Sequence, residues 1–388
     1  MRTLTSLAPA GRRALVRVDF NVPLDADGAI IDDARIRAAL PTLRHLVAQG
    51  CPCVVASHLG RPGGKPDDGL RMAPVCERLK ELMSDVAVEA CDDIAGDEAR
   101  ARASALAPGA ILVLQNLRFE PGEEKNDDGF AAELSRLGEI YVNDAFAVCH
   151  REHASVDALP RRFVAENRAA GLLVEREVEA IDDALHAPRR PLVAIFGGAK
   201  VSGKLAAMRT ALDRVDRILV GGAAACTLLK AGGEEVGTSM VEDDCLDEAR
   251  RLLETGGERL RLPRDHAVPA ARDDVRTVER IPRDAPALDI GPATITAYRQ
   301  IINDAGTVIW NGPLGYVEDA RFIGGTRGIA EALKCSDATC VAGGGHTGDI
   351  LRRLGLAEAM THVSTGGGAF LHYVAHRDLP ALRVLQKT

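Results

Sequence analysis

The stretch Ala14-Leu-Val-Arg-Val-Asp-Phe-Asn21 contains the pattern on which the fold class depends. Its first five residues form the largely apolar, β-branched run that is typical of a buried strand, and polar side chains follow at once. The pattern returns in three later segments: Cys53–Ala56, Ala110–Leu114 and Glu139–Val142. Helical periodicity lies between these runs, for example over Arg35–Gln49. This alternation predicts an α/β fold with a parallel sheet covered by helices.

The second half of the chain has strand-like runs that end in glycine instead of charge. They are Leu192–Phe196, Ile218–Val220, Val308–Trp310, Thr339–Ala342 and His362–Ser364. The last of these is followed by Thr365 and then by the glycines. Glycine after a strand lets backbone N–H groups approach a phosphate at a helix N-terminus, and ligands bind at the carboxyl edge of such sheets. We therefore expect two doubly wound, Rossmann-like parallel-sheet domains, the first with cationic side chains at its edge and the second with a phosphate-binding face.

The two halves are predicted to be joined by a helix. The segment from Ala165 to His186 is rich in charge and helix-forming residues, and Pro188 and Pro191 stop it. We interpret this segment as an interdomain helix and linker.

Composition narrows the class of partner. The 388 residues include 48 Lys and Arg against 56 Asp and Glu, a formal net charge of −8, which disfavours a nucleic-acid partner. No run of about 18 apolar residues occurs, so we expect neither a membrane span nor, at the N-terminus, a signal peptide. The nine cysteines have irregular spacing, which predicts free thiols in a reducing, cytoplasmic setting.

Two short motifs resemble nucleotide-binding fingerprints but lack an essential part. Gly198 to Lys204 matches the first seven positions of a P-loop, yet Leu205 stands where a Ser or Thr must bind magnesium. The run from Gly343 to Gly348 matches the spacing GxGxxG, yet no acid follows about 20 residues on to bind a ribose. Both interpretations are therefore disfavoured.

Taken together, the strand-end motifs resemble those of the phosphoglycerate kinase family. On the first half they are Arg17-Val-Asp-Phe-Asn-Val-Pro-Leu24, Ser57-His-Leu-Gly-Arg-Pro62, Asn116-Leu-Arg-Phe119, Asn143-Asp-Ala-Phe146 and His150-Arg-Glu-His153. On the second half they are Gly197-Gly-Ala-Lys-Val201, Trp310-Asn-Gly-Pro-Leu-Gly315 and Ser364-Thr-Gly-Gly-Gly-Ala369. The resemblance covers nearly the whole chain in the right order. It implies phosphoryl transfer between ATP or ADP and 3-phosphoglycerate or 1,3-bisphosphoglycerate, with hinge closure.

The resemblance also implies a domain layout. Residues 1–170 would bind 3-phosphoglycerate, residues 171–187 would form the interdomain helix, and residues 188–370 would bind the nucleotide. Residues 371–388 would return to the first domain. The family is mostly monomeric, so we expect a monomer.

Site residues follow from the same resemblance. For 3-phosphoglycerate it implies Asp19, Asn21, Arg35, His58, Arg61, Arg118, Arg151 and His153. For the nucleotide it implies Lys200, Lys204, Asn311, Glu318, Gly343, Gly344, Gly345, His346 and Thr347, with Glu318 at the ribose. For catalysis we predict that Arg35 and Lys200, with backbone donors at Gly345 and Gly367, act on the transferring phosphoryl group.

Elementary chemistry agrees with these roles. Arginine is permanently charged and binds oxyanions in a fork. Lys200 and Lys204 are four residues apart, so on a helix they share a face, and an anion between them would relieve their repulsion.

The nucleotide side departs from the family, most notably at His346. His346 stands where the family has an aspartate of the magnesium–nucleotide site, and imidazole is a poor ligand for Mg²⁺. No metal ligand is therefore assigned, and Mg²⁺ is expected to be bound chiefly through the nucleotide. Three interpretations stay open: an ordinary kinase, a specialised paralogue with another acid substrate or a metal such as Mn²⁺, and a non-catalytic homologue that binds a phosphorylated acid.

Overall fold

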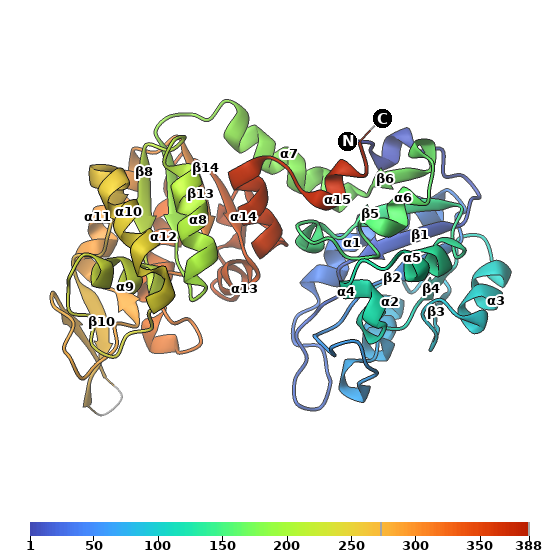
Figure 1. Ribbon diagram of the computed structural model, residues 1–388, viewed down its shortest axis with the longest axis horizontal. Helices are drawn as coiled ribbons and strands as arrows, with labels where there is room; N and C mark the ends of the chain where they lie inside the picture. The colour runs from blue at the N-terminus through green and yellow to red at the C-terminus, as the bar shows by residue number, and fades with distance from the viewer. Residues whose placement is uncertain (272–273, 387–388) are drawn as a thin grey trace. The chain divides into compact units, whose positions relative to one another are not determined.

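The computed structural model describes residues 1–271 and 274–386. Contacts divide the chain into two compact units. Unit 1 comprises Met1–Val178 and the chain from Asp378 onward, and unit 2 comprises Glu179–Arg377. Each unit has its own six-stranded parallel sheet with helices packed against it (Figure 1). The division falls inside helix α7 (Leu172–His186).

The sheet of unit 1 has the strand order β3-β4-β2-β1-β5-β6. Its strands are β1 (Ala14–Val18), β2 (Cys53–Ala56), β3 (Val88–Ala90), β4 (Ile111–Val113), β5 (Ile140–Asp144) and β6 (Arg168–Ala170). Its helices are α1 (Ala34–Ala48), α2 (Ala73–Leu82), α3 (Asp97–Ala105), α4 (Pro121–Glu124), α5 (Asp128–Ser135), α6 (Ala158–Arg161) and α15 (Pro380–Arg383). The strand order reverses between β1 and β5, which makes this edge the expected place for a ligand.

The parallel sheet of unit 2 has the order β15-β14-β13-β7-β8-β9. Its strands are β7 (Leu192–Phe196), β8 (Arg217–Val220), β9 (Leu260–Arg261), β13 (Thr307–Asn311), β14 (Thr339–Gly343) and β15 (His362–Ser364). Its helices are α8 (Val201–Ala211), α9 (Gly222–Ala231), α10 (Leu246–Gly256), α11 (Pro292–Asn303), α12 (Gly324–Lys334), α13 (Gly345–Arg353) and α14 (Gly367–His376). The order reverses between β7 and β13, where two of the predicted glycine turns meet.

A small antiparallel sheet accompanies the parallel sheet of unit 2. It consists of β10 (His266–Pro269), β11 (Val275–Val278) and β12 (Asp289–Ile290), in the order β11-β10-β12. The sequence analysis did not foresee this sheet, because its strands are short and half of the residues of β11 and β12 are polar.

The central strands are apolar because helices cover both faces of each sheet. All five residues of β1 and all five of β7 are buried. Strands buried on both faces read as continuous apolar runs, which explains why the sequence pattern predicted them well. The doubly wound α/β prediction is confirmed for both units.

The helix predicted from Ala165 was wrong at its start. Arg168–Ala170 pair with Tyr141–Asn143 as the edge strand β6, and α7 begins only at Leu172. Thr42 Oγ1 accepts the N–H of Leu172 at 2.9 Å, and Asp144 Oδ1 accepts the N–H of Leu173 at 2.9 Å. These two side chains satisfy the first amides of α7 and so define where the helix starts.

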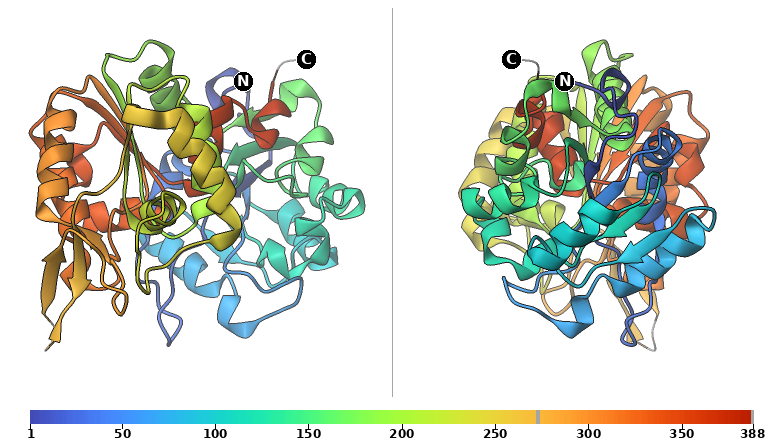
Figure 2. Two further views of the ribbon diagram at one scale, coloured as in Figure 1. Left: turned by 60° about the vertical axis from the view of Figure 1, so that its left-hand side comes forward. Right: turned by 90° about the vertical axis from the view of Figure 1, so that its right-hand side faces the viewer.

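The first residues of the chain and its last described residues belong to unit 1, and Figure 2 shows the dark blue start of the chain near the last dark red helix in both views. The N–H of Arg2 donates to Leu385 O at 2.9 Å, and the N–H of Ala381 donates to Cys149 O at 3.1 Å. Within residues 1–271 and 274–386, no helix combines the length and the apolar character that a bilayer crossing requires.

Candidate functional site

Asp19 lies directly after β1 and organises the predicted acid-binding cluster of unit 1. It is 5% exposed, and its carboxylate pairs with the guanidinium of Arg35 from the first turn of α1. Its Oδ1 accepts the N–H of Asn21 at 3.2 Å and lies 3.8 Å from His58 Nδ1. Asp19 therefore holds Arg35 at the sheet edge, and its own carboxylate oxygens are already engaged by Arg35 and Asn21.

His58 is a neutral imidazole in this cluster. It follows β2 and is buried, and Arg17 Nη2 lies 3.3 Å from its Nδ1. Burial, and then the charges of Arg17, Arg118 and Arg35, hold the pKa of His58 well below its usual range. A guanidinium can only donate, so its contact with Nδ1 at 3.3 Å favours the tautomer that has its proton on Nε2. His58 can then donate one hydrogen bond to a ligand oxygen.

Arg118 and His153 complete the buried part of the cluster. Arg118 is 5% exposed, donates from Nη1 to Gly60 O at 2.7 Å, and has its Nε 3.1 Å from Glu124 Oε1. Burial, with the charges of Arg151, Arg118 and Arg17, lowers the pKa of His153 to about 3. His153 is therefore a second neutral imidazole at physiological pH.

Arg61 and Arg151 supply charge that the protein leaves uncompensated. Neither guanidinium forms an ion pair within the described part of the chain. The charge of Arg151 acts on both Arg118 and His153, so these three side chains lie together. An excess of guanidinium groups beside two neutral hydrogen-bond donors is suited to a small ligand with several negative charges.

The sequence analysis missed three buried residues that support this cluster. Arg17 is 1% exposed inside β1, and its Nε donates to Ser155 Oγ at 2.8 Å. Ser155 in turn donates to Glu123 Oε1 at 2.6 Å, and Glu123 lies 4.0 Å from His153 Nδ1. A charged residue in the middle of an apolar strand was the signal that could have identified Arg17, since arginine is almost never fully buried without a partner.

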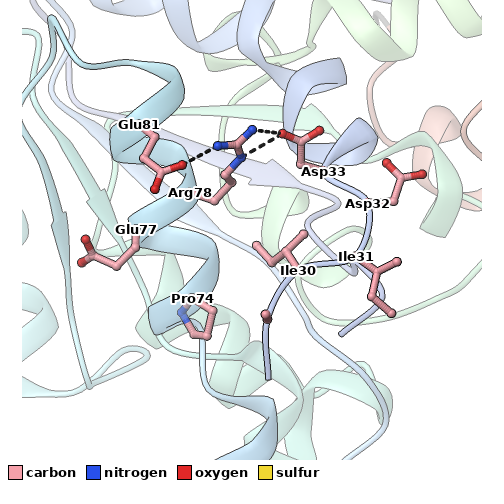
Figure 3. Close-up of a pocket in the computed structure, with 9 residues that line it drawn as sticks. Ile30, Ile31, Asp32, Asp33, Pro74, Glu77, Arg78 and Glu81 are labelled. Atoms are coloured by element: carbon pink, nitrogen blue, oxygen red, sulfur yellow. Dashed lines mark hydrogen bonds and ion pairs between the residues drawn. The ribbon is translucent and has the colours of Figure 1, made fainter. Parts of the chain in front are cut away.

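Unit 1 also has a hollow of about 540 Å³ that contains none of the predicted site residues. It lies beside α2, and Arg78 there binds Asp33 and Glu81 (Figure 3). Asp32 and Glu77 add two further carboxylates, so acidic groups outnumber basic ones. This hollow repels a phosphorylated acid and is not the predicted site.

Unit 2 has a cavity of about 600 Å³ at the carboxyl edge of its sheet, which we call the polyphosphate cavity. The predicted nucleotide or catalytic residues in its lining are Lys200, Lys204, Asn311, Gly344, Gly345, His346, Thr347 and Gly367. Small and apolar residues of α8 and α14 form much of the remainder. The structure thus brings together residues that are up to 167 positions apart, the separation of Lys200 and Gly367.

Two glycines allow β7 and β13 to approach closely beside this cavity. A Cβ on Gly312, whose φ is +92°, would lie 2.0 Å from Gly197 O, and a Cβ on Gly197 would lie 2.1 Å from Pro313 O. Both obstacles are backbone atoms that cannot move aside. Asn311 is fixed at the same place because its Nδ2 donates to Gly343 O at 2.9 Å.

Lys204 is a buried ammonium group on the cavity wall. It is 7% exposed, and its Nζ donates to Lys200 O at 3.3 Å. Burial, and then the charge of Lys200, lower the pKa of Lys204 to about 8. The charge of Glu242 offsets this lowering only in part. A buried ammonium group costs free energy that an anionic ligand would offset.

The three helices at the cavity begin differently. The first amides of α8 are taken, because Val201 N–H donates to Glu242 Oε1 at 2.9 Å and Ser202 N–H to Glu242 Oε2 at 3.1 Å. Helices α13 and α14 have glycine N-caps, Gly344 and Gly366, which supply no capping side chain. A phosphate would therefore meet lysine side chains at α8 and helix N-termini at α13 and α14.

Two predicted positions, Gly343 and Glu318, do not line the cavity. Gly343 is the buried last residue of β14, and its carbonyl binds Asn311. Glu318 is exposed in the loop after β13, outside the lining. Leu205 of the P-loop-like run is fully buried in the core, where it has no access to a ligand.

Comparison with known proteins finds, across the whole chain, the same family that the strand-end motifs resemble. A family model described as phosphoglycerate kinase matches residues 4–377. A phosphoglycerate kinase of Anaeromyxobacter sp. (strain K) is 47% identical over 399 residues, covering 100% of both chains. The structure of phosphoglycerate kinase from Coxiella burnetii superimposes with a TM-score of 0.82 at 36% identity, covering 99% of this chain and 98% of that one. That from Pyrococcus horikoshii OT3 gives 0.90 at 31% identity, covering 100% and 98%.

These matches extend over both units, and they agree with the topology and with the motifs at the strand ends. They include sequences well above 30% identity that cover the full chain. The chain therefore belongs to the phosphoglycerate kinase family.

Proposed function

We propose that this chain catalyses reversible phosphoryl transfer between ATP or ADP and 3-phosphoglycerate or 1,3-bisphosphoglycerate. The observation that carries the proposal is the cluster of guanidinium groups at the sheet edge of unit 1. Arg35 and Arg118 are held in place by Asp19 and Gly60, and Arg61 and Arg151 carry free charge. A phosphorylated three-carbon acid has about three negative charges near pH 7, which this excess matches.

The cluster would bind the acid through Asn21, Arg61, Arg118, Arg151 and the two neutral histidines. His58 would donate one hydrogen bond, and Asp19 would orient Arg35. The attacking group would be the carboxylate of 3-phosphoglycerate, which is already ionised because its pKa is near 4. No general base is required, so catalysis would consist of positioning and charge neutralisation.

The polyphosphate cavity would bind the nucleotide. Lys200 and Lys204 would neutralise the phosphates, with Asn311, Thr347 and the turn at Gly343–Gly345 around them. Arg35 and Lys200, with amides at Gly345 and Gly367, would contact the transferring phosphoryl group. Glu318 would bind the ribose. The two ligands must meet for transfer to occur, so we propose that residues 1–170 and 188–370 act as two domains that close about the helix at 171–187, with residues 371–388 returning to the first.

We further propose a cytoplasmic monomer that uses Mg²⁺, or Mn²⁺ in its place, bound chiefly through the nucleotide. The nine cysteines are unpaired, eight of them buried and Cys335 exposed, as expected in a reducing compartment. Sedimentation analysis would test the monomer, since a dimer would double the mass.

The direct test of the function is ATP consumption that depends on 3-phosphoglycerate, coupled to removal of the acyl phosphate. Turnover in Mg²⁺ or Mn²⁺ is the expected result. Binding of 3-phosphoglycerate without turnover in either metal would instead support a non-catalytic homologue. Turnover with another phosphorylated acid alone would support a specialised paralogue.

The buried ammonium of Lys204 predicts how nucleotide affinity depends on pH. With a pKa of about 8, Lys204 is charged below pH 8 and loses its charge above it in the free protein. A bound anion favours the charged form, so binding above pH 8 requires proton uptake. We expect the Kd of ADP to rise about tenfold between pH 8 and 9.5, measured by calorimetry.

The variant Lys204→Met provides the control for this pH dependence. It should bind ADP more weakly than the native chain but with a flat profile above pH 8. The stability of the ligand-free protein depends on pH in the opposite direction. The pKa of Lys204 falls from 10.5 to about 8 on folding, so between pH 8 and 10 the unfolded chain binds more protons than the folded chain. Unit 2 should therefore become more stable as the pH rises from 8 to 10. A native Kd that is constant from pH 7.5 to 9.5 would exclude the role of Lys204.

A further inference from the structure

The polyphosphate cavity is lined by basic side chains and by no acidic side chain among the described residues. Three basic side chains line it: Lys200, Lys204 and Arg209. Three imidazoles line it as well: His346, His372 and His376. None of the described residues in the lining is Asp or Glu, although acidic residues outnumber basic ones in the chain by 56 to 48. A concave site with charge of one sign concentrates ligands of the opposite sign.

Acidic side chains on the surrounding elements bind protein partners instead of facing the cavity. Glu242 accepts the first two amides of α8, at 2.9 and 3.1 Å. Asp182 of α7 accepts from Tyr373 of α14 at 3.0 Å and pairs with Arg377. Asp349 of α13 pairs with Arg352. The absence of carboxylates from the lining is thus a consequence of how the surrounding elements are built.

The residues present do not fit a magnesium ion held by the protein. Mg²⁺ requires hard oxygen ligands in a near-octahedral arrangement. The lining offers side-chain oxygens only on Asn311, Thr347 and Thr210 among the described residues. Thr347 Oγ1 already accepts the N–H of Gly312 at 2.9 Å, and Thr210 Oγ1 donates to Ala206 O at 3.1 Å. The described residues also contain no cluster of three or more His, Cys, Asp or Glu side chains that could hold a metal ion.

His346 occupies a place that is favourable for an anion and unfavourable for a cation. It is the second residue of α13, next to the positive end of the helix dipole. Lys200 and Lys204 lie in the same cavity lining, so positive charge accumulates there. A polyphosphate in the cavity would interact favourably with the imidazole, the two ammonium groups and the helix end together.

We propose that the polyphosphate cavity binds the nucleotide's phosphates as a metal-free anion, with His346, Lys200 and Lys204 supplying the compensating charge and hydrogen bonds, so that affinity does not depend on a divalent cation. The proposal rests on the proposed function only for the identity of the ligand. The cation that accompanies the nucleotide is then held by phosphate oxygens and water, and the protein gains nothing from its presence in the binding step.

The test is calorimetric titration of the full chain with ADP, once in EDTA and once in excess Mg²⁺. The native Kd should differ by less than about threefold between the two conditions, because protein cations replace the metal. His346→Asp should weaken binding in EDTA by about tenfold or more, because a carboxylate would face phosphate oxygens, and Mg²⁺ should restore much of that loss. Melting curves of the two proteins check that the variant is folded.

His346→Asn is the matched control. Asparagine keeps a side-chain donor but introduces no charge, so it should weaken binding equally in EDTA and in Mg²⁺. A native affinity that rises tenfold or more with Mg²⁺ would overturn the proposal, as would an unchanged metal response in His346→Asp. If the native chain turns over yet needs Mg²⁺ to bind ADP, this inference fails and the proposed function stands. If the folded chain neither binds ADP nor turns over in any condition, both fail.

Discussion

Arg35→Ala is expected to lower kcat by about a thousandfold at saturating substrate concentrations, with a much smaller change in the Kd of either ligand. Arg35 is 29% exposed and held by the buried carboxylate of Asp19, so its guanidinium is already oriented before any ligand arrives. Phosphoryl transfer to a carboxylate needs no proton transfer, and stabilising the charge on the transferring group is therefore the main task of the protein. Steady-state kinetics with both substrates saturating measures the effect.

Helix α1 itself provides a matched control for Arg35→Ala. Arg37 lies two residues further along α1, and its Nε pairs with Asp33 at 2.8 Å on the exposed surface. Arg37→Ala removes the same charge from the same helix and should change kcat by less than about twofold, since exposed ion pairs contribute little. Arg35→Lys tests whether positive charge alone is sufficient, because lysine keeps the charge but lacks the planar guanidinium that binds two oxygens at once. Equal kcat values for Arg35→Ala and Arg37→Ala would exclude a role for Arg35 at the phosphoryl group.

Gly312→Ala is expected to destabilise unit 2 by about 3–5 kcal/mol and to abolish measurable ADP binding. The added Cβ would meet Gly197 O at 2.0 Å and would require a side chain at a φ of +92°. Relief of this clash would push β13 away from β7, and both strands lead into the polyphosphate cavity. Trp310 is the only tryptophan of the chain, is fully buried in β13, and donates to Gly312 O at 2.8 Å. Its fluorescence in denaturant therefore reports the unfolding of unit 2.

Gly355→Ala separates backbone strain from the steric clash. Gly355 also has a positive φ, +66°, but a Cβ there has no atom within 4 Å. We expect a loss of about 1 kcal/mol, the cost of the left-handed conformation alone. If Gly312→Ala and Gly355→Ala lose similar stability, the close approach of β7 and β13 does not matter.

The parts of the fold that were predictable are those where burial dictates the residue type. The strands β1, β2 and β7 were predicted to the residue, because buried parallel strands must be continuously apolar. The edge strand β15 (His-Val-Ser) was also predicted, because glycines follow it closely in the sequence. The short edge strands β3, β6 and β9 were not predicted. They have two or three residues each, and pairing with a neighbour rather than local pattern makes them strands. Arg168–Ala170 looked helical for this reason.

The candidate site was predictable where a side chain follows a strand directly. The family resemblance assigned His58, Arg118 and Lys200, and all three come within five residues of the end of a strand, where the carboxyl ends of parallel strands converge. Arg17 was missed, because a residue inside a strand is normally read as core, and its partner Ser155 is 138 positions away. The capping of α8 by Glu242 was missed for the same reason, since only the folded chain shows that this carboxylate reaches helix amides 41 and 40 positions away.

The way in which unit 1 is closed by the last part of the chain has a consequence for synthesis. Unit 2 is one continuous segment, whereas unit 1 needs both the first residues and the chain from Asp378 onward. During synthesis on the ribosome, unit 2 has all of its residues as soon as Arg377 emerges. At that point Leu385 and Ala381, the hydrogen-bond partners of Arg2 and Cys149 in unit 1, have not yet been made available. The half of the protein that is made first is thus completed last.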